Sequence, residues 1–204
     1  MGVPAPTRRG HTAAPLPKRE AILRAAIDVF ADRGFFGAQV ADVARLAGVA
    51  AGTVYLYFRG KDDLLSSIFE CTMQEALTEG RATAQVADPA ERLRQIARAH
   101  LSRLGRDRSL AVVFQVELRQ SVKFMERFSA TLFQEYLGQI RAAIVDGQHA
   151  GVFRPNLNAT VVAKIFFGAL DEMATNWILS RRRYPLEGDV EAVLDVFLTG
   201  VRTR

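Results

Sequence analysis

Residues 39–65, QVADVARLAGVAAGTVYLYFRGKDDLL, constrain the fold of this chain more than any other stretch. They predict two short helices, about 40–47 and 51–58, which are joined by a turn at Gly48 and followed by a longer helix from Lys61. The apolar side chains expected between the two short helices are Val43, Leu46, Val49 and Val54. The pattern is that of a helix-turn-helix, which lays its second helix in the major groove of DNA.

The second short helix carries the side chains that we expect to face DNA. Hydroxyl groups of threonine and tyrosine can bond phosphate oxygens, and their apolar parts can contact a thymine methyl. At the flanks, Lys61 can meet the DNA backbone as a point charge, and Gln39 can pair with adenine or reach a phosphate. The predicted DNA-binding set is Gln39, Val40, Thr53, Tyr55, Leu56, Tyr57 and Lys61. The alternative for the two tyrosines is a place in the core, where we also expect Phe58.

The positive charge of the chain is concentrated at its N-terminal end. Residues 1–61 hold nine lysines and arginines and four acidic residues, whereas the remainder holds 18 of each kind, so the whole net charge of +5 lies in the first third. Such a distribution suits a polyanion, and double-stranded DNA is the expected partner. Residues 1–17, rich in proline and arginine, are expected to form a disordered basic arm, either a simple tail or one that touches a phosphate or a minor groove.

The rest of the sequence predicts helices only. Apolar residues recur at spacings of three and four from Lys18 onward, and no alternating strand pattern occurs. Asp88, before Pro89, and Asn158 are expected to cap the first turns of two helices. We therefore predict an all-α chain of about nine helices, with an N-terminal three-helix helix-turn-helix domain over 18–61 and a second helical domain over 62–204. The first helix is expected to end at Gly34. Later helices are expected to cover about 108–119, 122–149, 158–183 and 189–202.

Composition and spacing favour a cytoplasmic protein that is not an enzyme. One cysteine, Cys71, excludes an internal disulfide and fits a reducing compartment. The N-terminus lacks the apolar segment of a signal peptide, and no apolar run approaches the roughly 20 residues that span a bilayer, so no membrane contact is expected. The three histidines lie far apart in sequence, and neither metal-ligand spacing nor a nucleophile motif is present. We therefore expect no catalytic residues, no metal and no cofactor.

The helix-turn-helix region also carries a long set of residues at fixed spacing. The set is Gly34-Phe35, Val40, Asp42-Val43-Ala44, Ala47-Gly48-Val49, Gly52-Thr53, Tyr55, Tyr57-Phe58, Lys61 and Leu64-Leu65. With this set, residues 20–66 resemble the DNA-binding domain of TetR-family regulators. Three positions depart from that pattern: a threonine is usual at Gln39, and a serine and often a lysine at Ala50 and Ala51. Without the serine the helix loses a cap worth ~1 kcal/mol, and without the lysine one potential phosphate contact is lost.

Four later segments, 116–121 (VELRQS), 151–154 (GVFR), 167–172 (FGALDE) and Trp177, resemble the TetR-type repressors of fatty-acid degradation. Long-chain acyl-CoA releases those repressors from DNA. The resemblance implies that 62–204 binds an apolar small-molecule effector, with long-chain acyl-CoA as the candidate, and forms the dimer. An acyl tail needs an apolar tunnel. The candidates for its lining, which core packing would explain as well, are Phe69, Met73, His100, Phe114, Leu118, Phe128, Phe133, Phe166, Leu170 and Trp177.

The head of a CoA ester would need cations for its phosphates, preferably arginine. Four arginines lie on the outer side of the helix after Pro89, and a solvated helix face is the favoured explanation for each of them: Arg92, Arg94, Arg98 and Arg103. On the next helix, Glu117 falls on an apolar face and needs a partner, for which Arg119 is the nearest candidate in sequence.

The segment 158–183 is apolar nearly all round, which predicts burial on every side. A second copy of the chain is the simplest cover, so we expect a homodimer in which this helix and the last one form a four-helix bundle with their copies. A two-fold dimer sets its recognition helices about 34–36 Å apart, or a multiple of that, and therefore predicts a palindromic operator.

Together these features predict a repressor that acyl-CoA releases from its operator. One alternative keeps the fold and replaces the effector with another apolar drug or metabolite. A different alternative is a ligand-independent architectural DNA-binding protein with weak sequence preference.

Overall fold

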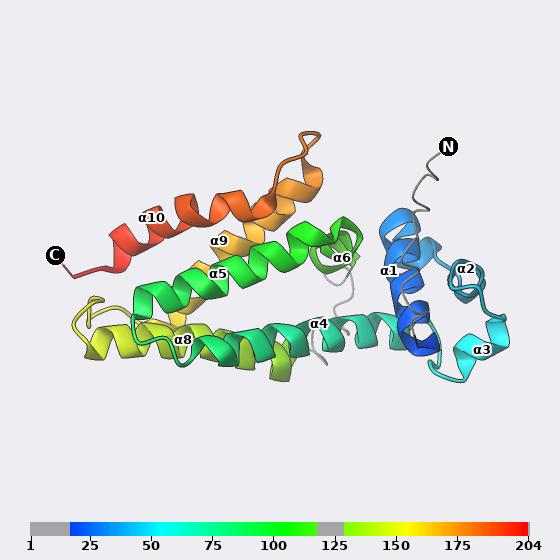
Figure 1. Ribbon diagram of the computed structural model, residues 1–204, viewed down its shortest axis with the longest axis horizontal. Coiled ribbons are helices and arrows are strands. Elements are labelled where there is room, and N and C mark those ends of the chain that lie inside the picture. The colour runs from blue at the N-terminus through cyan, green and yellow to red at the C-terminus, as the bar shows by residue number, and fades with distance from the viewer. Residues whose placement is uncertain (1–16, 118–128, 204) are drawn as a thin grey trace, which may run out of the picture.

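The computed structural model describes residues 17–117 and 129–203, and over these ranges it is helical without a β-strand. Figure 1 shows an elongated molecule in which a small group of helices at one end is joined to a larger bundle by one long helix. The small group consists of α1 (Lys18–Gly37), α2 (Val40–Leu46) and α3 (Ala51–Tyr55). The long helix is α4 (Lys61–Thr83), and the bundle adds α5 (Pro89–Arg106), α6 (Arg108–Val112), α8 (Gln134–His149), α9 (Ala159–Leu179) and α10 (Val190–Val201). The predicted all-α class with an N-terminal helix-turn-helix is confirmed.

Two glycines set the turns of the small group. Gly34 has φ 69° and ψ 160°, which interrupts α1 where the sequence predicted its end. Gly48 has φ 68° and makes the predicted turn between α2 and α3. The helix α3 is shorter than expected, although the Phe58 N–H still bonds the Val54 carbonyl at 2.9 Å. Of the four apolar residues expected between the short helices, Leu46 is an exception, because it is 57% exposed.

Side-chain caps begin α5 and α9. The Asp88 carboxylate accepts from the Ala90 N–H at 2.9 Å, and Asn158 Oδ1 accepts from the N–H groups of Thr160 and Val161. Both caps were expected from the sequence, and each satisfies backbone donors that have no partner inside the helix.

The helix predicted over 108–119 is divided. Its first part is α6, and its second part is a π-helical turn, η1 (Val113–Glu117). A second π-helical turn, η3 (Ser129–Phe133), precedes α8. The part of the predicted 122–149 helix before residue 129 lies outside the described residues, as do 1–16 of the predicted basic arm.

The helix α9 ends at Leu179, four residues before the expected end. The Arg108 guanidinium of α6 donates to the carbonyls of Trp177 at 3.2 Å and Ile178 at 2.6 Å. Carbonyls of a last helical turn lack partners within the helix, so a long-range arginine can fix the end point.

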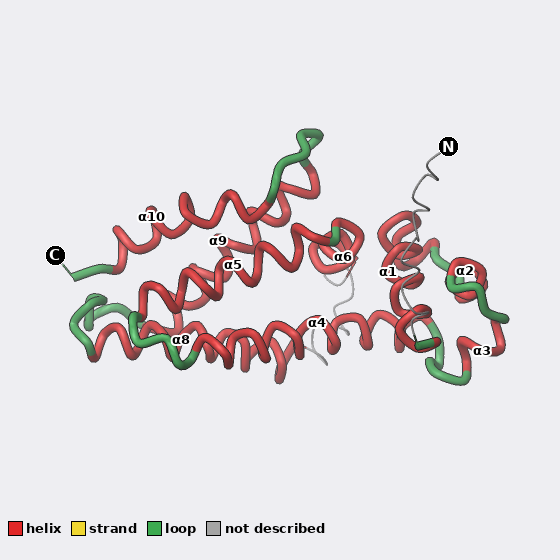
Figure 2. Tube along the Cα trace, viewed as in Figure 1, coloured by secondary structure: helices red, strands yellow, loops and turns green. Residues whose placement is uncertain are grey.

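The far end of the bundle is tied together by backbone bonds. The Arg154 N–H bonds the Val201 carbonyl at 2.9 Å, and the Thr203 N–H bonds the Val152 carbonyl at 3.1 Å. Figure 2 shows the loop after α8 beside the C-terminal segment. The buried Phe153 ring in this loop packs so closely on Gly147 that a Cβ there would lie 2.1 Å from the ring. The loop therefore anchors the end of α10.

Candidate functional site

The tip of α3 presents large side chains to solvent. Tyr55 is 57% exposed, Leu56 81% and Tyr57 44%, whereas Val54 and Phe58 beside them are buried. This division follows helical geometry, because Val54 and Phe58 are four positions apart and share the inner face. The expected core position of Phe58 is confirmed, and the two tyrosines stand on the open face. Gln39 is also exposed, while Val40 and Thr53 are half-buried.

A network of charges fixes α2 against α1. Asp42 accepts from Arg45 at 2.9 Å and pairs with Arg33 of α1 at 2.6 Å. The hydrogen bond from Arg45, with the charge of Arg33, holds the pKa of Asp42 below its ordinary value. Asp42 therefore stays charged, and it helps to hold the helix on which α3 rests. At the start of α3, Ala50 provides no side-chain cap, as the sequence indicated.

Lys61 has a structural contact that the sequence did not predict. Its Nζ donates to the carbonyl of Phe35 at 3.0 Å and to that of Phe36 at 3.2 Å, and it lies 4.8 Å from the centre of the Phe35 ring. The ammonium group thus caps the end of α1 from the first residue of α4. Its contact with a DNA phosphate stays a prediction, for which one of its three donors is left.

Among the described residues, two further polar contacts join α1 to the segment from the end of α5 to η1. Arg24 of α1 bonds Asp28 on its own helix and Asp107 at the junction of α5 and α6. The second contact is buried: Glu117 Oε2 accepts from the Phe35 N–H at 2.6 Å. Glu117 thus has its required partner in the backbone of α1, and Arg119, the partner suggested by the sequence, lies outside the described residues.

The bundle brings together part of the predicted ligand-binding set. His100, Phe133 and Phe167 meet between α5, α8 and α9, with ring centres 5.8 Å apart for His100 and Phe167 and 4.9 Å for Phe133 and Phe167. Tyr136 completes this aromatic cluster, and its hydroxyl lies 3.1 Å from His100 Nδ1. Tyr136 and Phe167 were not in the predicted set, although each lies on an apolar helix face of the sequence.

Other members of the set are placed elsewhere. Phe69 stacks on Phe114 at 5.8 Å, between α4 and η1. Phe166 packs on Phe197 of α10 at 4.7 Å, and the Trp177 indole donates to the Tyr184 carbonyl at 2.8 Å. Met73 and Leu170 are buried on α4 and α9, and Leu118 and Phe128 lie outside the described residues.

His100 is held neutral within the aromatic cluster. Burial lowers its pKa to about 4 and raises the pKa of Tyr136. Its Nε2 is buried without a hydrogen-bond partner among the described residues. A neutral imidazole beside three aromatic rings leaves the cluster predominantly apolar, with one polar atom to spare.

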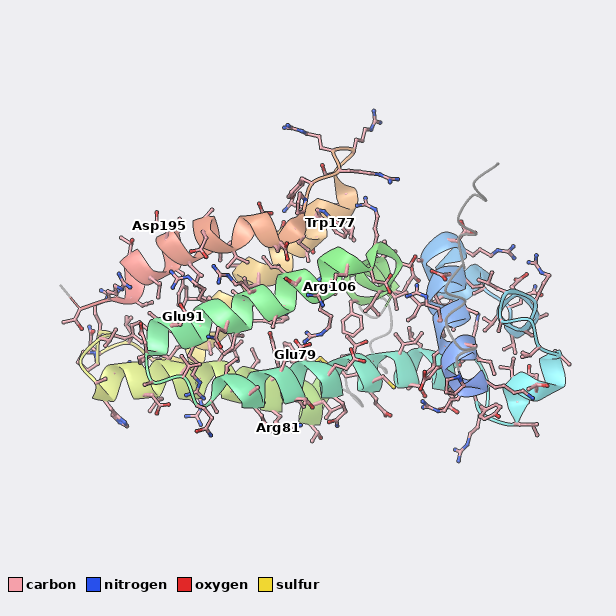
Figure 3. All side chains as sticks on the ribbon, in the orientation of Figure 1. Glu79, Arg81, Glu91, Arg106, Trp177 and Asp195 are labelled. Carbon is pink, nitrogen blue, oxygen red and sulfur yellow. The ribbon has the colours of Figure 1, made fainter. Side chains whose placement is uncertain are left out.

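A cleft of about 520 Å³ opens between α4 and α5. It is lined by Glu75, Glu79, Arg98, Ala99, Ser102, Arg103, Arg106 and Leu110. Arg103 pairs with Glu79 across the cleft, and Figure 3 shows Glu79 and Arg106 on the two facing helices. The helix face predicted to be solvated is therefore partly covered. Arg92 on the same helix is also buried, and it bonds Asp146 of α8 at 2.8 Å.

The helices α9 and α10 share an apolar groove on the outside of the bundle. Its volume is about 580 Å³, and it lies between Ile165 and Met173 of α9 and Val193 and Val196 of α10. Ile165 is 58% exposed and Val196 77%. This face of α9 is open within one chain. The cover that the sequence analysis expects for it, a second copy of the chain, stays a prediction.

Within the described ranges, no group of histidine, cysteine, aspartate or glutamate side chains could hold a metal ion. None of the described helices is long and apolar enough to cross a membrane.

The sequence matches two family models. Residues 22–68 match the model of bacterial regulatory proteins of the tetR family, and residues 69–200 match the C-terminal region of YsiA-like proteins, also a TetR-type model. Among curated proteins, the fatty acid metabolism regulator protein of Bacillus subtilis (strain 168) is 31% identical over 92% of this chain and 97% of its own length.

Two solved structures are similar over almost the whole chain. The fatty acid degradation regulator FadR from Bacillus halodurans has a TM-score of 0.86 and 34% identity, covering 94% of this chain and 100% of that one. FadR from Bacillus subtilis, in complex with stearoyl-CoA, has a TM-score of 0.83 and 30% identity, covering 90% and 99%.

Proposed function

Because the chain belongs to the TetR family of bacterial regulatory proteins, we propose that it is a dimeric repressor of fatty-acid metabolism genes. In this proposal a long-chain acyl-CoA releases the dimer from a palindromic operator. The observation that carries the proposal is the likeness, over 90% of the chain, to a regulator bound to stearoyl-CoA. The aromatic cluster between α5, α8 and α9 supports the same ligand class, since acyl chains bind in apolar, aromatic-lined sites.

The proposed DNA-contacting surface is the open face of α3 with its flanks. Tyr55 and Tyr57 combine hydroxyl groups with exposed rings, and Leu56 adds an apolar side chain that can meet a thymine methyl. Gln39 and Thr53 complete the polar part of this face. The predicted consequence is a site with base preference and a moderate salt dependence, because few cations stand on this face.

The proposed dimer interface is the groove between α9 and α10. Its exposed apolar side chains, such as Ile165 and Val196, are unusual for a surface that stays in water. A second copy, related by a two-fold axis, would present the same groove, so that each copy covers the exposed apolar side chains of the other. The pairing would place two copies of α3 on one side of the dimer and make the operator palindromic.

The effector would use two adjoining parts of the bundle. The acyl chain would lie in the aromatic cluster around His100 and Phe167, and the CoA phosphates would lie in the cleft between α4 and α5. Among the arginines of that cleft, Arg103 and Arg98 already pair with Glu79 and Glu191. Arg106 has no hydrogen bond or ion pair within the described residues, so its guanidinium is the one most readily offered to a phosphate.

The test is operator binding with and without stearoyl-CoA. A binding selection from random duplexes should first yield a palindrome, and fluorescence anisotropy should then show release by micromolar stearoyl-CoA. Arg106→Ala should raise the concentration needed for release. The matched control is Arg81→Ala, which removes an exposed arginine of α4 that pairs with Glu135 outside the cleft. No release at micromolar stearoyl-CoA would reject this effector class, and a selection without a palindrome would reject the dimeric operator.

A further inference from the structure

One buried carboxylate connects the bundle to the bend in α1. Glu117 is 6% exposed, and its Oε2 accepts from the Phe35 N–H at 2.6 Å. Both carboxylate oxygens lie 3.7 Å from the point that a Cβ on Gly34 would occupy. The carboxylate therefore sits directly against the bend. Hydrogen bonds to a charged acceptor are about twice as strong as neutral ones, so this contact is a strong one for its size.

The same π-helical turn is fixed to α9 on its other side. Gln115 is buried, its Nε2 donates to Asp171 Oδ1 at 3.0 Å, and its Oε1 accepts from Thr175 Oγ1 at 3.0 Å. Gln115 and Glu117 are only two residues apart, yet they contact different helices. A π-helical turn changes the direction of successive side chains, and such turns are frequent at functional positions.

The backbone at Phe35 is also bonded to α4. The Phe35 carbonyl accepts from Lys61, the first residue of α4, while the Phe35 N–H donates to Glu117. The end of α1 is thus bonded both to η1 and to the helix that enters the bundle. Figure 1 shows α6, which leads into η1, lying beside α1.

The hydrogen bond of Glu117 fixes the position of α1 relative to η1, which apolar packing alone does not. Apolar contact between α1 and the bundle is non-directional and tolerates a small sliding motion. A hydrogen bond weakens steeply when its angle changes, so the Glu117 contact holds α1 in one register relative to η1. A shift of α9 would move η1 through Gln115, and η1 would then move the bend of α1 through Glu117.

We propose that Glu117 is the positioning residue through which the effector-binding bundle sets the position of the DNA-binding helices, with Gln115 as its anchor on α9. The proposal rests on the proposed function, because it concerns the coupling between operator and effector. The quantity at issue is the ratio of operator Kd values with and without saturating stearoyl-CoA, which measures the coupling between the two sites.

The experiment measures this ratio for Glu117→Gln, Glu117→Ala and Gln115→Ala in the full-length protein. Glu117→Gln keeps the shape and an acceptor oxygen, so it provides a folded variant with a weakened bond. Typical couplings are about 5–150-fold, and we expect Glu117→Ala to lower the ratio by about fivefold or more, with Glu117→Gln intermediate. Isothermal titration without DNA should show that each variant still binds stearoyl-CoA. The double variant Gln115→Ala/Glu117→Ala should lose no more than the larger single loss, because both residues act through one segment.

The matched control is Glu70→Gln, which alters an exposed glutamate of α4 that has no hydrogen bond or ion pair among the described residues. It should keep the wild-type ratio. A lower Tm and weaker operator binding with an unchanged ratio in both Glu117 variants would make Glu117 merely structural and overturn the proposal. That result would leave the proposed function standing. If wild-type protein is not released by stearoyl-CoA, the proposed function fails instead, and the coupling proposal fails with it.

Discussion

Replacing Gly34 with alanine should destabilise the protein through the backbone alone. Gly34 has φ 69° and ψ 160°, a region that is essentially restricted to glycine. A residue forced into such a region costs of the order of 1–3 kcal/mol. The added Cβ would lie 3.7 Å from the Glu117 carboxylate oxygens, which is ordinary contact, so no steric overlap adds to this cost.

Gly37 provides the matched control in the same helix. A Cβ at Gly37 would meet only the Arg33 Cβ, at 3.9 Å, and its φ is not positive. Gly37→Ala should therefore be neutral or stabilise by about 0.4–1 kcal/mol, because alanine restricts the unfolded chain.

The assay is thermal unfolding followed by far-UV circular dichroism. For a chain of this size 1 kcal/mol corresponds to roughly 2–4 °C in Tm, so Gly34→Ala should lower Tm by roughly 2–12 °C. The protomer concentration must be equal in all samples, since the Tm of the proposed dimer would depend on it. Equal Tm values for Gly34→Ala and Gly37→Ala would refute the reasoning from backbone conformation.

Three further predictions concern the bundle. Val196→Glu puts a charge in the apolar groove between α9 and α10, and light scattering should show loss of the dimer; an unchanged mass would contradict the proposed interface. Burial lowers the pKa of His100 to about 4, so the unfolded chain takes up the proton first, and stability should fall by up to roughly 3 kcal/mol as the pH drops from about 6.5 to 4. The urea midpoint should depend less on pH over this range in His100→Gln than in the wild type, and His149→Gln, which alters an exposed histidine, should keep the wild-type dependence. Asp88→Ala removes the cap of α5 and should lower the free energy of unfolding by about 1 kcal/mol in urea titrations, and no change would argue against the cap.

Features that depend on neighbouring residues were predictable from the sequence. The caps at Asp88 and Asn158, the bend at Gly34 and the buried position of Phe58 each follow from residues within one or two helical turns. The open face with Tyr55 follows in the same way, because burial of Val54 and Phe58 leaves the next positions outside.

Features that depend on distant partners were not predictable. Glu117 meets Phe35 across 82 positions, and Arg108 reaches the end of α9 across about 70. Helical periodicity gives each side chain a direction but not the helix that it meets. For that reason Arg92 and Arg103 were expected in solvent, whereas α8 and α4 pack against them and supply Asp146 and Glu79.

Because α4 is long, a small tilt at its bundle end becomes a larger displacement at its other end. This helix has 23 residues, which at 1.5 Å per residue makes it about 34 Å long, and Figure 1 shows it running from the bundle to the end of α1. A tilt of about 5° at its bundle end displaces the other end by about 3 Å, a distance comparable to one hydrogen bond. In the proposed two-fold dimer, the α4 helix of the second copy would move by the same amount in the opposite direction. A small expansion of the bundle on effector binding would then shift both copies of α3 out of register with a rigid duplex.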